Sequence, residues 1–163
     1  MKKFPNLKNP FHFFASLGGI GCIPIAPGTF GSFFSAILFI VISHHLDDML
    51  IPTIVSIVFS ILVCEIASKD LANKDHKAIV IDELAGMWVA VCPIIYFENI
   101  GMHERLIYVF ICFLLFRFFD ITKPFPISFF DTRIKNGFGI VMDDVVAGCF
   151  AGLISVLILY FLF

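Results

Sequence analysis

Two pairs of acidic residues stand beside long apolar segments in this chain of 163 residues. Asp82 and Glu83 come directly before one apolar segment, and Asp143 and Asp144 come directly before another. A carboxylate close to a membrane is unfavourable unless a metal ion or an opposite charge compensates it. Carboxylate oxygens are ligands that Mg²⁺ prefers, often together with a substrate phosphate. The alternative is that each pair only caps a helix N-terminus.

A fifth acidic residue and two cations lie at the end of another apolar segment. Asp120 and Lys123 are three residues apart, so they share one face if the helix continues that far. Arg117 lies inside the apolar segment, and two readings of it stay open. It binds a phosphate or the acidic cluster, or it reaches from the membrane to its surface. Among the histidines, only His76 is near the acidic residues, and it is a weak candidate.

A glycine-rich segment, GGIGCIPIAPGTFGS, covers residues 18–32. Glycines let the main chain approach a ligand, and the N–H groups at a helix start can bind an anion. The segment lacks the lysine of a P-loop, and no strand precedes it as in a dinucleotide-binding site. It is a phosphate-binding turn that uses Gly28, Thr29 and Ser32, or a simple hairpin turn. We expect Thr29 or Ser32 to cap the helix that follows.

The composition is typical of a membrane protein. Hydrophobic residues make up 60% of the chain and charged residues 15%, against about 25% charged in an average soluble domain. No basic run with interleaved aromatic residues is present, so no nucleic-acid partner is expected. Five cysteines without a CxxC pair favour buried thiols over disulfides or a zinc site. The length predicts one domain, residues 1–163.

Five apolar segments predict an all-α fold. They cover residues 30–43, 50–64, 84–97, 106–119 and 145–163 and lack the alternation of strands. All but the last are shorter than the roughly 20 residues of a full membrane span, so we expect several short or partly embedded helices. Pro93 should kink or break the third helix. The polar region 120–144 is expected to be an ordered loop.

Helices that alternate in direction would gather the charges at one end of the bundle. The N-terminal segment and the links 65–83 and 120–144 would lie at this end, and the links 44–49 and 98–105 at the other. Ten of the eleven Lys and Arg residues then fall at the first end, with Arg105 alone at the second. This bias predicts that the first end is cytoplasmic. Nine of the thirteen acidic residues fall there too, including both pairs.

Missing motifs exclude several phosphatase mechanisms. The chain has no Cys-x5-Arg of cysteine phosphatases, no DxDx[TV] of enzymes that form an aspartyl phosphate, and no spaced aspartates of CDP-alcohol phosphotransferases. An acidic cluster beside an anion-binding turn favours metal-assisted hydrolysis of a phosphate ester. Two other classes stay open: a membrane transport or ion-binding protein with an acidic cytoplasmic vestibule, and a soluble helical binding protein.

Four sequence blocks resemble the phosphatidylglycerophosphatase A family over nearly the whole chain. In order, they are GGIGCIPIAPGTFGS, KDHKAIVIDELAGMW, RFFDITKPFPI and GFGIVMDDVVAG. The resemblance implies a Mg²⁺-dependent membrane phosphatase that hydrolyses phosphatidylglycerophosphate to phosphatidylglycerol in phospholipid biosynthesis. It implies an all-α fold with a central helix surrounded by others. The expected location is the bacterial inner membrane, with the active site on the cytoplasmic face.

The same resemblance, with the chemistry of the residues, gives a predicted site. Metal ligands are expected among six acidic residues, namely Asp75, Asp82, Glu83, Asp131, Asp143 and Asp144. The substrate is expected to bind at Gly28, Thr29, Ser32, Arg117 and Lys123. The expected catalytic residues are Asp120, Lys123 and Asp143. One carboxylate should take a proton from the attacking water, and attack by Asp120 or Asp143 itself stays open.

Overall fold

The structure is a computed structural model that describes residues 4–69, 71, 74, 76–97 and 100–162. These residues form helices and no strand, which confirms the predicted all-α fold. In chain order, the helices are α1 (Pro10–Ala15), the 3₁₀ helix η1 (Leu17–Cys22), α2 (Pro27–Ser43), α3 (Leu50–Ala67), α4 (Asp82–Val91), the 3₁₀ helix η2 (Cys92–Tyr96), α5 (Met102–Thr122), α6 (Ile127–Arg133) and α7 (Gly137–Leu162).

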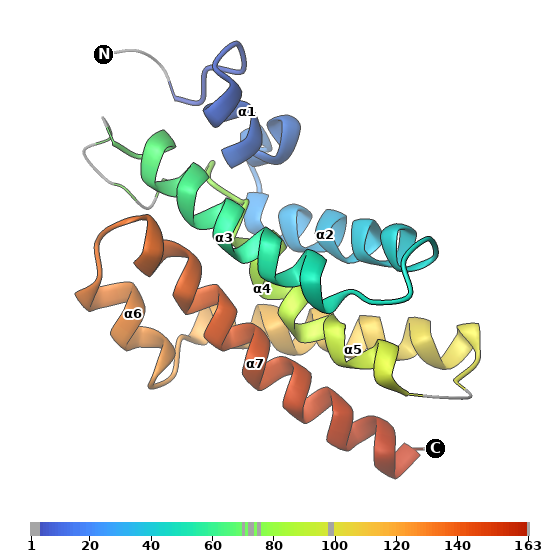
Figure 1. Ribbon diagram of the computed structural model, residues 1–163. Coiled ribbons are helices and arrows are strands. Elements are labelled where there is room, and N and C mark those ends of the chain that lie inside the picture. The colour runs from blue at the N-terminus through green and yellow to red at the C-terminus, as the bar shows by residue number, and fades with distance from the viewer. Residues whose placement is uncertain (1–3, 70, 72–73, 75, 98–99, 163) are drawn as a thin grey trace.

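The short helix α4 forms the centre of the bundle. All of its residues except Val89 are buried, including Asp82 and Glu83 at its start. It packs against α7, α2, α3 and α5, and its contact with α7 is the most extensive. In Figure 1, α3 and α7 lie in front of it. The expected central helix surrounded by others is therefore confirmed, and this helix carries the first acidic pair.

The start of α7 differs from the sequence-based expectation. The helix begins at Gly137 rather than at residue 145, so Asp143 and Asp144 lie inside it and not before it. Two acceptors satisfy the N–H groups of its first turn: Glu65 Oε2 accepts from Gly137 at 2.6 Å, and Asn136 Oδ1 accepts from Gly139 at 3.0 Å. The helix is thus capped upstream of the apolar segment that predicted it.

The polar region 120–144 is also more regular than the expected loop. It contains the end of α5, the whole of α6 and the first turns of α7. Only residues 123–126 and 134–136 link these helices. The expectation was wrong because Lys123, Asp131 and the second acidic pair line a polar cavity, so hydrophobic periodicity does not reveal these helices.

Two further boundaries show one wrong and one correct prediction. Neither Thr29 nor Ser32 caps α2: this helix begins at Pro27, whose fixed φ suits a first position, and the Ser32 hydroxyl donates to the Gly28 carbonyl oxygen at 2.9 Å. The expected break at Pro93 is confirmed. The chain leaves α-helical geometry at Val91 and continues as η2.

Glycines allow the main chains of α4 and α7 to come into direct contact. A Cβ atom at Gly86 would lie 2.6 Å from the carbonyl oxygen of Asp144, and a Cβ atom at Gly148 would collide with the carbonyl oxygen of Gly86. Gly148 and Gly152 are four residues apart, a spacing of small residues that allows close helix contacts in membranes. Glu83 precedes Gly86 by about one turn and Asp144 takes part in the contact itself, so the contact brings their side chains close together.

The outer surfaces of the long helices are apolar. Two segments, Leu50–Ala67 and Gly137–Phe161, are long and apolar enough to cross a membrane by length and composition, and α2 is a shorter apolar helix. Soluble domains rarely expose apolar surface on this scale, which indicates a membrane protein. Large side chains that are more than half exposed lie on all four long helices, for example Phe33 on α2, Val58 on α3, Phe110 on α5 and Leu153 on α7.

The alternation of the helices separates a charged end from an opposite end. The links that follow α3 and α5 lie at one end of the bundle, and the links that follow α2 and η2 lie at the other (Figure 1). Arg105 lines a cavity at the opposite end together with His44 and His45. Both acidic pairs and Asp120 line one cavity at the charged end. The expected gathering of the acidic pairs is thus seen in the fold.

Candidate active site

A cavity of about 660 Å³ opens at the charged end of the bundle. Its wall is built from the start of α2, the link before α4, the start of α4, the end of α5, and the segment from α6 to the first turns of α7. Gly28 and Thr29 line it, as the sequence predicted, with Arg117, Asp120 and Lys123. Ser32 does not line it but contacts Arg117.

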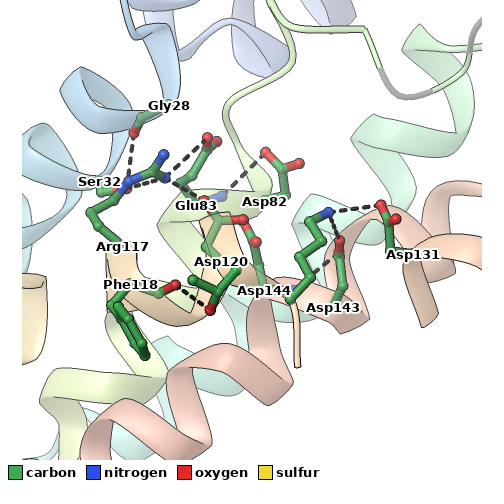
Figure 2. A network of polar contacts seen from close by, with 12 residues as sticks. Gly28, Ser32, Asp82, Glu83, Arg117, Phe118, Asp120, Asp131, Asp143 and Asp144 are labelled. Carbon is green, nitrogen blue, oxygen red and sulfur yellow. Dashed lines mark hydrogen bonds and ion pairs between the residues drawn. The ribbon is translucent and has the colours of Figure 1, made fainter. Parts of the chain in front are cut away.

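Three carboxylates form the acidic triad of this cavity: Asp82, Glu83 and Asp144. One oxygen atom of each lies within 4.8 Å of the others, and all three residues are buried. The start of α4 is held in place by the Ser60 hydroxyl, which donates to the Ile81 carbonyl oxygen at 3.0 Å. The glycine contact between α4 and α7 fixes the third carboxylate. Figure 2 shows the three side chains converging from the two helices.

The acidic triad fits a divalent metal ion. Glu83 Oε2 is buried and has no hydrogen-bond partner among the described residues. Burial and the neighbouring charge of Asp144 raise the pKa of Glu83 to about 8. Such crowding of hard oxygen atoms is what a divalent cation relieves, because it supplies the missing partner and favours the charged carboxylates.

Arg117 joins the acidic triad to α2 and to Asp120. Its Nη1 atom lies 2.7 Å from Asp120 Oδ2, 3.8 Å from Glu83 Oε1 and 3.3 Å from the Ser32 hydroxyl. The carboxylate of Asp120 lies near that of Asp144, and both line the cavity. A Cβ atom at Gly28 would collide with Glu83 Oε1, so a side chain at this position would displace the Glu83 carboxylate.

Lys123 organises a second group of carboxylates. It ends α5 in a left-handed conformation, with φ at 41°, and its Nζ lies 2.7 Å from Asp131 Oδ1 and 2.6 Å from Asp143 Oδ2. Burial alone would lower the pKa of this amine, but the two carboxylates outweigh it and raise the pKa, so the side chain stays charged. Figure 2 shows this group beside the acidic triad.

The structure thus separates the predicted metal ligands into two groups. Asp82, Glu83 and Asp144 converge on one point, whereas Asp131 and Asp143 contact Lys123. Asp75, the sixth predicted ligand, lies outside the described residues. The charges of the second group are already balanced in part, so it offers fewer unshared oxygen atoms to a cation.

Three lysines line the cavity that were not predicted as site residues: Lys74, Lys77 and Lys135. The count of basic residues placed them at this end, and Lys74 and Lys77 also stand in the second of the four sequence blocks that carry the family resemblance. His76, the weak candidate, does not line the cavity. Its Nδ1 accepts the Ala78 N–H at 3.2 Å, and its ring packs against Phe4.

Comparisons with known proteins agree on one family. A family model described as Phosphatidylglycerophosphatase A matches residues 13–159. Two proteins with that name, from Haemophilus influenzae and Escherichia coli, are each 36% identical to the chain over 96% of its length, and the matches cover 93% and 85% of theirs. A putative phosphatidylinositol-3-phosphatase from Bacteroides thetaiotaomicron is 32% identical over 82% of the chain and 83% of its own length. No solved structure matches the chain.

Proposed function

Since this chain belongs to the phosphatidylglycerophosphatase A family, we propose that it hydrolyses phosphatidylglycerophosphate to phosphatidylglycerol and inorganic phosphate, a step in phospholipid biosynthesis. One observation links this proposed activity to the candidate active site. A buried triad of carboxylates and the guanidinium of Arg117 face one cavity at the charged end of an apolar helical bundle. That arrangement suits a phosphate whose lipid tails remain in the membrane.

The acidic triad would hold Mg²⁺. Asp82, Glu83 and Asp144 offer only hard oxygen ligands, and the unpartnered Oε2 of Glu83 is an oxygen that a cation would satisfy. When bound there, Mg²⁺ would polarise the phosphate ester and the attacking water. The number of ligands is small for this ion, which leaves room for water and for phosphate oxygens.

Arg117 and Lys123 would neutralise the phosphate oxygens. The Nε atom of Arg117 is buried and has no hydrogen-bond partner among the described residues, so it can donate to an anion in the cavity. Lys123 is kept charged by Asp131 and Asp143, which also fix its direction. Fixed donors of this kind stabilise the charge that builds up on a phosphoryl group as its ester bond breaks.

Asp120 is our choice for the general base. It lines the cavity, contacts Arg117 and lies next to Asp144 of the acidic triad. As the oxygen of water forms its bond to phosphorus, the carboxylate takes the proton from the water. The bond between phosphorus and the glycerol oxygen breaks, and the same proton passes to that oxygen. In this scheme Asp143 positions Lys123, and no covalent intermediate forms.

The membrane would hold the rest of the substrate. Apolar side chains on the outer faces of α2, α3, α5 and α7 suit the acyl chains of lipids. The excess of Lys and Arg at the end that carries the cavity supports a cytoplasmic orientation. We therefore propose that the chain lies in the bacterial inner membrane, with the cavity open to the cytoplasmic surface.

Phosphate release from phosphatidylglycerophosphate tests the proposal. The protein, purified in detergent, should release phosphate with Mg²⁺ and lose activity with a chelator. Asp82→Asn and Asp144→Asn should each lower turnover by at least about 100-fold. Asp47→Asn, an exposed carboxylate at the opposite end, is the matched control and should keep normal turnover. Near-normal turnover in both site variants would mean that the acidic triad is only structural.

A panel of lipid phosphates tests the substrate. Phosphatidic acid and phosphatidylinositol 3-phosphate are compared with phosphatidylglycerophosphate, because one relative bears the name of a phosphatidylinositol-3-phosphatase. We expect the highest kcat/KM with phosphatidylglycerophosphate. A higher value with the inositol lipid would keep the phosphatase assignment and overturn the choice of substrate.

A further inference from the structure

The basic side chains that line the cavity fall into two groups. Arg117 and Lys123 are each held by two carboxylates. The other three form no ion pair with a carboxylate of any described residue. They are called the lysine group here and consist of Lys74, Lys77 and Lys135.

The lysine group lies away from Arg117. The Nζ atom of Lys135 donates to the main-chain oxygen of Asp131, whose carboxylate holds Lys123. Lys74 and Lys77 belong to the link between α3 and α4. Arg117 is on the other side of the acidic triad, against Gly28 and Ser32 of α2, as Figure 2 shows. The cavity therefore has one cation, Arg117, beside the acidic triad and α2, and a second cationic wall formed by the link before α4 and the link after α6.

The second wall is partly apolar. Leu71, Ile79, Ile134 and Ile140 line the cavity together with the lysine group. Lys77 and Lys135 are exposed, so an anion can reach their side chains from solvent. An anion bound here would contact these lysine side chains without displacing a carboxylate of a described residue. An anion at Lys123 would compete with Asp131 and Asp143.

The charge of the cavity shows why a second cationic wall is needed. Six carboxylates line the cavity, and Arg117 and Lys123 together do not balance them. Without the lysine group, even a bound divalent cation would leave the cavity net negative, and a lipid with two phosphates would be repelled. The lysine group reverses the sign of the net charge, so the cavity can accept an anionic lipid.

The proposed substrate has two phosphates with different chemistry. The terminal phosphate is a monoester, which the reaction removes. The other is a diester between the terminal glycerol and the diacylglycerol, and it stays in the product. A diester phosphate carries one negative charge and is not the reacting group, so ammonium groups suit it well. Phosphatidic acid has no such diester.

We infer that the lysine group binds the diester phosphate of the substrate while the acidic triad and Arg117 take the terminal phosphate. This inference rests on the proposed function. It makes Lys74, Lys77 and Lys135 specificity residues that select lipids with a second phosphate one glycerol unit away from the reacting one. They take no part in bond breaking, so they should act on KM and leave kcat unchanged.

The test compares a ligand that contains the diester phosphate with one that lacks it. Phosphatidylglycerophosphate in mixed detergent micelles is used to measure KM and kcat, and inorganic phosphate, which lacks the diester, is used as a competitive inhibitor. In the double variant Lys77→Ala/Lys135→Ala, KM should rise about tenfold, a loss of ~1.4 kcal/mol of binding. The inhibition constant of inorganic phosphate and kcat should stay as in the wild type. Lys77→Arg/Lys135→Arg should restore most of the lost affinity.

A lysine outside the cavity controls for attraction to the anionic micelle. Lys69→Ala removes an exposed charge at the same end that does not line the cavity, and it should leave KM unchanged. The inference is wrong if KM of the double variant is unchanged, if kcat falls instead, or if the inhibition constant rises in step with KM. A wild-type protein that releases no phosphate from the lipid would refute the proposed function, and the inference with it.

Discussion

Gly86 on α4 faces the carbonyl oxygen of Asp144 on α7 so closely that a Cβ atom at Gly86 would lie 2.6 Å from it. The two helices meet here at main-chain distance, and Asp144 belongs to the acidic triad. The packing contact and the site are therefore parts of one arrangement. A change that separates the two helices should therefore displace the side chains of the site before it unfolds the protein.

Gly86→Ala should disturb the acidic triad through this contact. The added methyl group would force α4 and α7 apart, which typically costs about 1–3 kcal/mol of stability in a packed core. We expect at least a tenfold loss of kcat/KM, because small misplacements of catalytic groups have effects of about this size or larger. Phosphate release and thermal unfolding in detergent measure the two effects.

Gly152→Ala is the matched control for this change. A Cβ atom at Gly152 would lie 3.0 Å from the Ala90 carbonyl oxygen, at the same helix interface but two turns further from the acidic triad. It should lower stability with little loss of activity. Equal activity losses in the two variants would show that general destabilisation, and not the position of Asp144, is responsible.

Mg²⁺ should stabilise the protein against unfolding through the acidic triad. A ligand that binds only the folded state at 100 times its Kd adds about 2.7 kcal/mol, so Tm should rise when Mg²⁺ replaces a chelator. Asp144→Asn should abolish this rise. In chelator the same variant should be at least as stable as the wild type, because it removes one of three crowded carboxylates.

Asp131→Asn separates the two groups of carboxylates in the same measurement. Asp131 contacts Lys123 rather than the acidic triad, so this variant should keep most of the Mg²⁺-dependent rise in Tm. If it abolishes the rise and Asp144→Asn does not, the metal site lies at Lys123 and the assignment to the triad is wrong.

Sequence reasoning named carboxylates that line the cavity but could not group them. Adjacent acidic pairs on a charged end identified Asp82, Glu83 and Asp144, and the resemblance to a family added Asp131. Which carboxylates share a cation depends on the contact of α4 with α7 and on the direction of Lys123. Neither is visible in hydrophobic periodicity, because both are set by the packing of segments far apart in the chain.

Hydrophobic periodicity also failed to predict where α7 begins. Its apolar part predicts a helix from residue 145, but the first turns carry glycines and the acidic pair. A side chain on another helix, Glu65 of α3, satisfies the first N–H group of α7. These first turns line the polar cavity with Gly139, Asp143 and Asp144 while Ile140 and Val141 pack in the core, so polar and apolar residues are mixed there.

Arg117→Lys should lower kcat/KM by about 100-fold although the charge is kept. The guanidinium contacts Asp120, Glu83 and Ser32 at once and keeps Nε for an anion. A lysine is a point charge and cannot make this set of contacts. Ser32→Ala, which removes only the hydroxyl contact, should cost a few-fold. Wild-type activity in Arg117→Lys would show that charge alone suffices at this position.

Glu65→Ala should loosen the start of α7. Glu65 Oε2 accepts the N–H of Gly137 at 2.6 Å, and its negative charge also lies at the positive end of the helix dipole. Loss of such a cap typically costs about 1 kcal/mol, which corresponds to a fall in Tm of about 2–4 °C for a chain of this size. Glu65→Gln keeps an acceptor oxygen and should lose less. Because the second acidic pair follows within two turns of Gly137, hydrogen exchange at residues 137–144 should rise in Glu65→Ala; unchanged exchange and Tm would show that Asn136 alone caps the helix.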